Sequence, residues 1–152
     1  MTAYRAQDWA IRPATPADVE ALVTMRRRLQ NHMVHANPAL LPMSAQGRTA
    51  LPTQYREAIA EATAHVVVVQ ARGTAALVGM AVGRIVVHEA LVPSHLGRID
   101  DVWVEPPYRR QGICRSLVQQ LVVFFERRTT YARACDWSQW TPRLGPGTFS
   151  DH

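Results

Sequence analysis

The chain has 152 residues, of which 47% are hydrophobic and 19% are charged, and its net charge is +5 with arginine as the sole basic residue type. This composition excludes a disordered chain, and the length favours one domain with its own core. Because no apolar run is long enough to cross a bilayer and the first residues lack the apolar core of a secretory signal, we expect a soluble cytoplasmic protein without a membrane partner.

The first part of the chain is predicted to form a strand followed by two helices. Residues 9–13 are typical of a short strand, and Thr15 and Pro16 provide an N-cap and a first helical position. Residues 37–52, which include three prolines, are predicted to be a loop, and residues 54–62 a short helix. The first helix is indicated by apolar residues at helical spacing, namely Val19, Leu22, Val23, Leu29 and Met33.

The second part is predicted to form three strands and a helix. Residues 65–70 are a β-branched run, Gly73 lies in a turn, and residues 76–87 form the next strand, which gives an antiparallel hairpin. Residues 98–104 are predicted to be another strand, and residues 112–127 an amphipathic helix.

A basic turn joins these last two elements. Arg109 and Arg110 precede Gly112, which opens the helix. A helix N-terminus presents backbone N–H groups and a partial positive charge, so it attracts phosphate. Gly112 has no Cβ atom, so a phosphate can approach the backbone closely. The turn therefore predicts a phosphate-bearing ligand.

The element order and the segment Val104-Glu-Pro-Pro-Tyr-Arg-Arg-Gln-Gly-Ile-Cys114 resemble the GCN5-related N-acetyltransferase (GNAT) superfamily. Its acetyl-CoA signature is Gln/Arg-x-x-Gly-x-Gly/Ala, and Cys114 occupies the last position here. The resemblance implies an α/β (α+β) fold with a mixed, mostly antiparallel sheet flanked by helices, and acetyl-CoA as co-substrate. The implied coenzyme-binding residues are Val102, Trp103, Val104, Arg109, Arg110, Gln111, Gly112, Ile113, Cys114, Arg115 and Ser116.

Asp100 and Asp101 are the candidate catalytic residues. Neighbours on a strand point to opposite faces, so at most one is expected on the substrate's face. Related enzymes often carry Glu-Asp here with the first acid near the amine, so the resemblance implies Asp100 as base or water holder and Asp101 as a positioning or structural residue. The alternative is that each carboxylate is simply paired with a nearby arginine. A general acid is not identified, because Tyr131 lies too early in the chain and Tyr108 is expected to pack.

No metal site is predicted, because His32 and His35 are three residues apart without an evident third ligand. We expect residues 1–128 to form the GNAT-like domain and residues 129–152 to be an atypical C-terminal segment of it. A complete family member continues with a fifth strand and a fourth helix, whose patterns residues 129–152 lack. A partner subunit, a rewritten C-terminal end or a naturally short domain would each explain this. A homodimer is the preferred hypothesis, since an exposed strand edge invites pairing.

The sequence thus predicts an N-acetyltransferase that acts on a primary amine of a small molecule or a protein. One alternative is a non-catalytic, regulatory domain that binds acyl-CoA. The other is a basic nucleic-acid-binding protein, which no nucleic-acid-binding motif supports.

Overall fold

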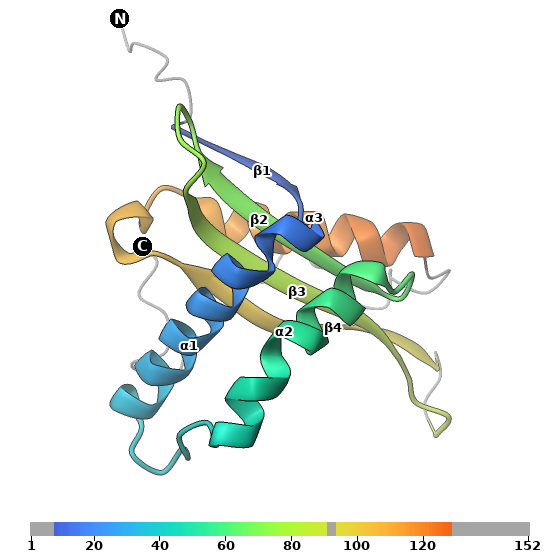
Figure 1. Ribbon diagram of the computed structural model, residues 1–152. Coiled ribbons are helices and arrows are strands. Elements are labelled where there is room, and N and C mark those ends of the chain that lie inside the picture. The colour runs from blue at the N-terminus through green and yellow to red at the C-terminus, as the bar shows by residue number, and fades with distance from the viewer. Residues whose placement is uncertain (1–7, 91–93, 129–152) are drawn as a thin grey trace, which may run out of the picture.

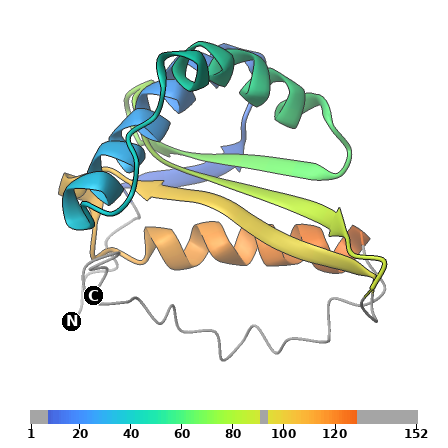
Figure 2. The same ribbon diagram turned by 90° about the horizontal axis from the view of Figure 1, so that it is seen from below.

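The computed structural model describes residues 8–90 and 94–128. Four strands form one antiparallel sheet in the order β1-β2-β3-β4, with two helices on one face and a third helix on the other (Figures 1 and 2). This architecture confirms the predicted fold class, while the expectation for residues 129–152 lies outside the described residues. The elements are β1 (Trp9–Pro13), the 3₁₀ turn η1 (Pro16–Asp18), α1 (Val19–Ala36), α2 (Ala45–Ala60), β2 (Ala64–Ala71), β3 (Leu77–Val87), β4 (His95–Val104), the 3₁₀ turn η2 (Pro106–Tyr108) and α3 (Ile113–Arg128).

The predicted hairpin is confirmed by the antiparallel pairing of β2 with β3. Gly73 lies in the turn between them with φ of +74°, a value that glycine adopts without steric cost. β2 is buried over nearly its whole length, because α1 and α2 cover one face of the sheet and α3 covers the other. A continuous β-branched run suits a strand that is buried on both faces.

The start of α1 is fixed by an ion pair with β1. The guanidinium of Arg12 donates to both carboxylate oxygens of Asp18, at 2.7 and 2.9 Å, and the backbone N–H of Thr15 donates to the same carboxylate at 2.8 Å. The hydrogen bond from Arg12 is the main reason that the pKa of Asp18 is lowered. Thr15 is the N-cap and Pro16 the first helical position, as predicted, although the first turn is 3₁₀.

The second helix is longer than predicted, because α2 begins at Ala45 and runs through Pro52. Ser44 caps its start, with the hydroxyl oxygen accepting from the N–H of Gly47 at 3.0 Å. Proline removes one intrahelical hydrogen bond. The helix nevertheless continues, because Leu51 and Tyr55 lie one turn apart and bury their side chains against the sheet. The predicted loop over residues 37–52 is therefore wrong for its last eight residues.

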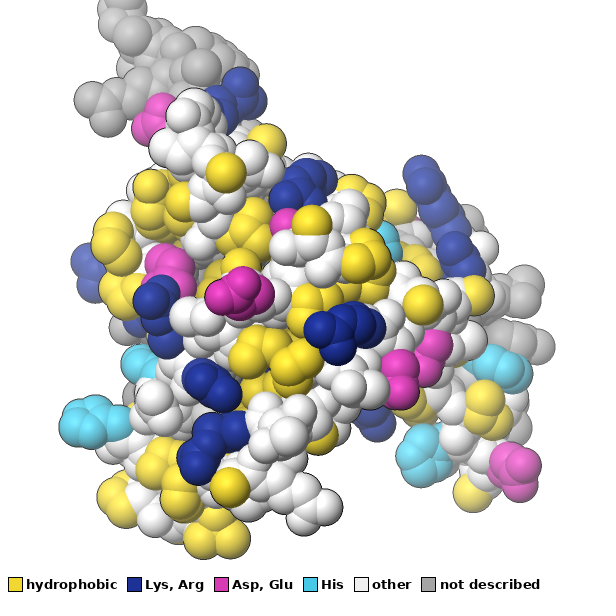
Figure 3. Space-filling view, in the orientation of Figure 1, with side chains coloured by type: hydrophobic (Ala, Val, Ile, Leu, Met, Phe, Trp, Pro, Cys, Tyr) yellow, Lys and Arg dark blue, Asp and Glu magenta, His cyan; other side chains and the backbone are white. Residues whose placement is uncertain are grey.

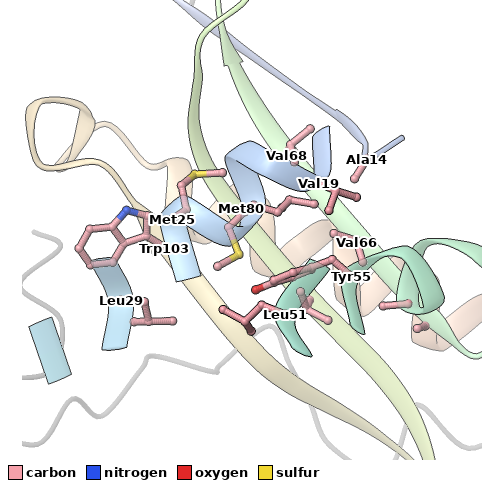
Figure 4. Packing of buried hydrophobic residues seen from close by; sticks show 14 residues of the cluster. Ala14, Val19, Met25, Leu29, Leu51, Tyr55, Val66, Val68, Met80 and Trp103 are labelled. Carbon is pink, nitrogen blue, oxygen red and sulfur yellow. The ribbon is translucent and has the colours of Figure 1, made fainter. Parts of the chain in front are cut away.

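Two hydrophobic clusters sit on opposite faces of the sheet. Figure 4 shows the cluster under α1 and α2, where Tyr55 extends from α2 across the sheet and Trp103 packs at the end of β4. The other cluster lies under α3, and there Phe125 contacts two glycines, Gly83 and Gly97. Both strands need a residue without a Cβ atom at these points for α3 to approach the sheet. Within residues 8–90 and 94–128, no helix is long and apolar enough to cross a bilayer.

Candidate active site

β4 carries one extra residue relative to β3. Val82 pairs with Asp101 and Gly83 pairs with Ile99, so Asp100 has no opposite residue on β3 and forms a bulge. A bulge interrupts the alternation of side chains along a strand. Asp100 and Asp101 therefore line the same pocket, and the expectation that they point to opposite faces is wrong.

We call this the carboxylate pocket and define it by Arg26, Tyr55, Arg84, Asp100 and Asp101. It is a cavity of about 70 Å³ between the helices α1 and α2 and the strands β3 and β4, all of which contribute to its walls. Figure 3 shows this face, on which arginine side chains surround a cluster of hydrophobic side chains. Leu51, Ala58 and Val82 also line the pocket, so it combines paired charges with apolar side chains.

Asp100 is held by two arginines. The Nε atom of Arg84 lies 3.0 Å from one of its carboxylate oxygens, and the Nε atom of Arg98 lies 2.5 Å from the other. Arg84 also contacts Glu61 near the end of α2, at 3.2 Å. Asp100 thus has the arginine pairing that was the alternative interpretation of both acids.

Asp101 is held more loosely and is more deeply placed. Its Oδ1 atom lies 3.4 Å from Nε of Arg26 on α1, and its Oδ2 atom accepts from the hydroxyl of Tyr55 on α2 at 3.4 Å. Burial raises the pKa of Asp101, and the positive charge of Arg26 is the largest opposing effect. A carboxylate with a raised pKa that lines a pocket is suited to accept a proton.

The predicted basic turn follows the end of β4. After η2, Arg110 has φ of +65° and Gly112 has φ of +81°, and α3 begins at Ile113. Alternation of this kind directs successive N–H groups to one side and forms an anion-binding concavity. A Cβ atom added to Gly112 would have no heavy atom within 4 Å among the described residues, so the backbone there is open to a ligand.

The side chains of the predicted coenzyme-binding residues divide into two groups. Trp103, Val104 and Ile113 are core residues, 5%, 5% and 1% exposed. The guanidinium of Arg109 stacks on the Trp103 ring at 4.8 Å and donates from Nε to the carbonyl of Val104 at 2.9 Å, so it ties the turn to β4. Tyr108 packs against the cluster under α3, as expected. Of the predicted coenzyme-binding groups, the turn backbone and the side chains that are not buried are accessible from outside the core.

Three residues of the carboxylate pocket were missed by the sequence interpretation, namely Arg26, Tyr55 and Arg84. Arg26 belongs to a run of three arginines on α1. The run is visible in the sequence, but it does not show which of the three arginines lies in a site. Tyr55 lies in the predicted short helix over residues 54–62, where no motif was recognised. Its partner Asp101 is 46 residues away along the chain. In the part of the chain that the structure describes, no group of three or more histidine, cysteine, aspartate or glutamate side chains could hold a metal ion.

Comparison with protein families gives one model that matches residues 29–138, the model of the acetyltransferase (GNAT) family. The matched part contains the basic turn, α3 and all residues that define the carboxylate pocket except Arg26. A comparison with curated proteins found no match.

Solved structures with the same fold include several acetyltransferases. A predicted acetyltransferase from Clostridium acetobutylicum, solved with acetyl-CoA, is 17% identical with a TM-score of 0.63, over 79% of this chain and 75% of that chain. An aminoglycoside 6'-N-acetyltransferase from Acinetobacter baumannii is 18% identical with a TM-score of 0.59, over 79% and 73%. A glucosamine-6-phosphate N-acetyltransferase from Arabidopsis thaliana is 13% identical with a TM-score of 0.59, over 81% and 78%.

Proposed function

This chain belongs to the acetyltransferase (GNAT) family, and we propose that it transfers the acetyl group of acetyl-CoA to a primary amine. The observation that carries the proposal is the bulge in β4. It brings Asp100 and Asp101 into one pocket, directly beside the segment Val102–Val104 that leads into the basic turn.

The coenzyme fits the residues that follow the pocket. The open backbone at Gly112 and the N–H groups around it would hold the pyrophosphate, with Arg110, Gln111, Arg115 and Ser116 close enough in the chain to add contacts. β4 is the last strand of the described sheet, so Val102–Val104 present a strand edge to the pantetheine arm.

Bound acetyl-CoA supplies the thioester carbonyl that an amine attacks. The new C–N bond forms as the C–S bond breaks, and the nitrogen must lose a proton to the protein or to water. We assign this proton to Asp101, because its carboxylate is buried in the pocket and carries fewer charged contacts than that of Asp100. Asp100 then orients Arg84 and balances its charge. This reverses the roles that the resemblance implies for the two acids.

A coenzyme-binding assay followed by turnover tests the proposal. Acetyl-CoA should raise the midpoint temperature of unfolding of the protein. When a panel of amines is then added, free coenzyme A thiol should be released from acetyl-CoA. Stabilisation without release from any amine would favour the non-catalytic acyl-CoA-binding domain. An unchanged thermal midpoint would overturn the proposed coenzyme site.

The homodimer stays a prediction, and so do the cytoplasmic location and the domain boundary at residue 128. The strand edge of β4 is a surface that a second copy or the coenzyme could occupy. Sedimentation with and without acetyl-CoA separates these two occupants, because a dimer formed through this edge should dissociate when the coenzyme binds there.

A further inference from the structure

The carboxylate of Asp101 is contacted from two different helices. Tyr55 reaches Oδ2 from α2, and Arg26 reaches Oδ1 from α1, each at 3.4 Å. The side chains of Arg26 and Asp101 are both about 20% exposed, so the pair is largely removed from solvent. Each oxygen therefore has its own partner: Oδ2 accepts a hydrogen bond from Tyr55, and Oδ1 forms an ion pair with Arg26.

The hydroxyl of Tyr55 is not needed for packing. The ring fills the cluster between α2 and the sheet, and the residue is 4% exposed (Figure 4). Phenylalanine would fill the same space. Burial and the negative charge of Asp101 raise the pKa of Tyr55, so the hydroxyl keeps its proton and acts as a donor. The contact with Asp101 is what the hydroxyl adds.

We infer that Tyr55 and Arg26 are positioning residues, which hold the Asp101 carboxylate towards the pocket so that it can receive the proton of the acceptor amine. The part of the inference that concerns proton transfer from the amine rests on the proposed function. The contacts themselves are independent of that function, so the two can fail separately.

The charged groups around Asp101 determine how its pKa should change in a variant. Arg26 on α1 and Arg84 on β3 favour its ionised form, as does the hydrogen bond from Tyr55, whereas burial and the neighbouring Asp100 oppose it. Removal of the Tyr55 hydroxyl or of the Arg26 charge should therefore raise the pKa of Asp101 further. A purely structural role of either residue would change stability without moving this pKa.

The test compares Tyr55→Phe and Arg26→Gln with two matched controls. Met25→Leu changes a buried side chain of the same cluster at nearly constant volume, and Arg27→Gln removes an exposed charge from the next position of α1. In Tyr55→Phe, the acid limb of kcat/KM should move to higher pH by about 0.5 to 1 unit, and in Arg26→Gln by at least as much. Neither control should move the limb.

A ¹³C NMR titration of the Asp101 side-chain carboxyl group gives the same comparison without turnover. Its midpoint should rise in Tyr55→Phe and Arg26→Gln relative to the wild type and both controls. An unmoved midpoint in both variants would overturn the inference, whether or not the enzyme is active. A moved midpoint in a protein that acetylates no amine would preserve the contacts and overturn the proposed function.

Discussion

The carboxylates of Asp100 and Asp101 enter the same pocket although the two residues are neighbours on one strand. The bulge at Asp100 is the cause, because it places two consecutive side chains on one face of the sheet. The two acids differ in their partners, since Asp100 contacts two arginines closely and Asp101 contacts one arginine and one tyrosine at longer range.

Asp101→Asn should lower kcat about 100-fold, the usual order for loss of a general base, with little change in the coenzyme's affinity. Because burial raises the pKa of Asp101, wild-type kcat/KM should fall as the pH drops through that raised value, and the variant should lack this limb. Steady-state kinetics measured from neutral pH down towards the ordinary aspartate pKa of 3.8 checks both predictions.

Asp100→Asn is the matched variant for Asp101→Asn, since it removes the adjacent charge from the same pocket. It should retain the acid limb and lose less activity. If the losses are the other way round, with Asp101→Asn near wild type, the proton acceptor is Asp100 as the resemblance implies.

Gly112→Ala should weaken acetyl-CoA binding by about tenfold or more, because a methyl group would stand where the phosphate approaches. Gly73→Ala is a close control, since Gly73 has φ of +74° against +81° for Gly112 and both have open space around the Cα atom. Each substitution should cost about 1–2 kcal/mol of stability from the left-handed backbone. Calorimetric titration should separate them, and equal affinities would place the pyrophosphate elsewhere.

Gly97→Ala should destabilise the fold by about 1–3 kcal/mol, because a Cβ atom there would lie 2.5 Å from Cγ of the Phe125 ring. The backbone of β4 or the ring must move to accommodate it. Phe125→Leu replaces the ring with a smaller side chain, so the two substitutions should be less harmful together than the sum of each alone. Urea denaturation of the four proteins of this double-mutant cycle measures the coupling. Strict additivity would contradict the packing of α3 on these glycines.

Asp18→Asn should lower stability at pH 7 by about 1–2 kcal/mol, which is below the usual worth of a hydrogen bond between charged groups because the Arg12 side chain is 37% exposed and screened by solvent. The Arg12 pair lowers the pKa of Asp18 in the folded protein, so its contribution is present above the unfolded value of 3.8 and is lost as the pH falls through the folded value. Urea unfolding should show a smaller difference in the free energy of unfolding between variant and wild type near pH 3 than at pH 7. Glu57→Gln, on the exposed side of α2, is the control and should have the same free energy of unfolding as the wild type at both pH values.

Local sequence patterns were sufficient to predict those elements that are specified by their own residues. The β-branched run gave β2, the apolar spacing gave α1 and α3, and the residue pair Thr15 and Pro16 marked the helix start. The basic turn with Gly112 was also readable, because positive φ and a helix N-terminus are properties of a few consecutive residues.

The tertiary structure decided what depends on distant contacts. α2 continues through Pro52 because Leu51 and Tyr55 are buried on the sheet, which outweighs the local preference against a helix. The bulge depends on the register between β3 and β4, and that register put both acids into one pocket. The contact between Tyr55 and Asp101 spans 46 residues, so no local pattern contains it. The sequence by itself therefore determined the fold class and the basic turn with its glycine, and only the packing of the helices on the sheet determined which carboxylate is buried and what holds it.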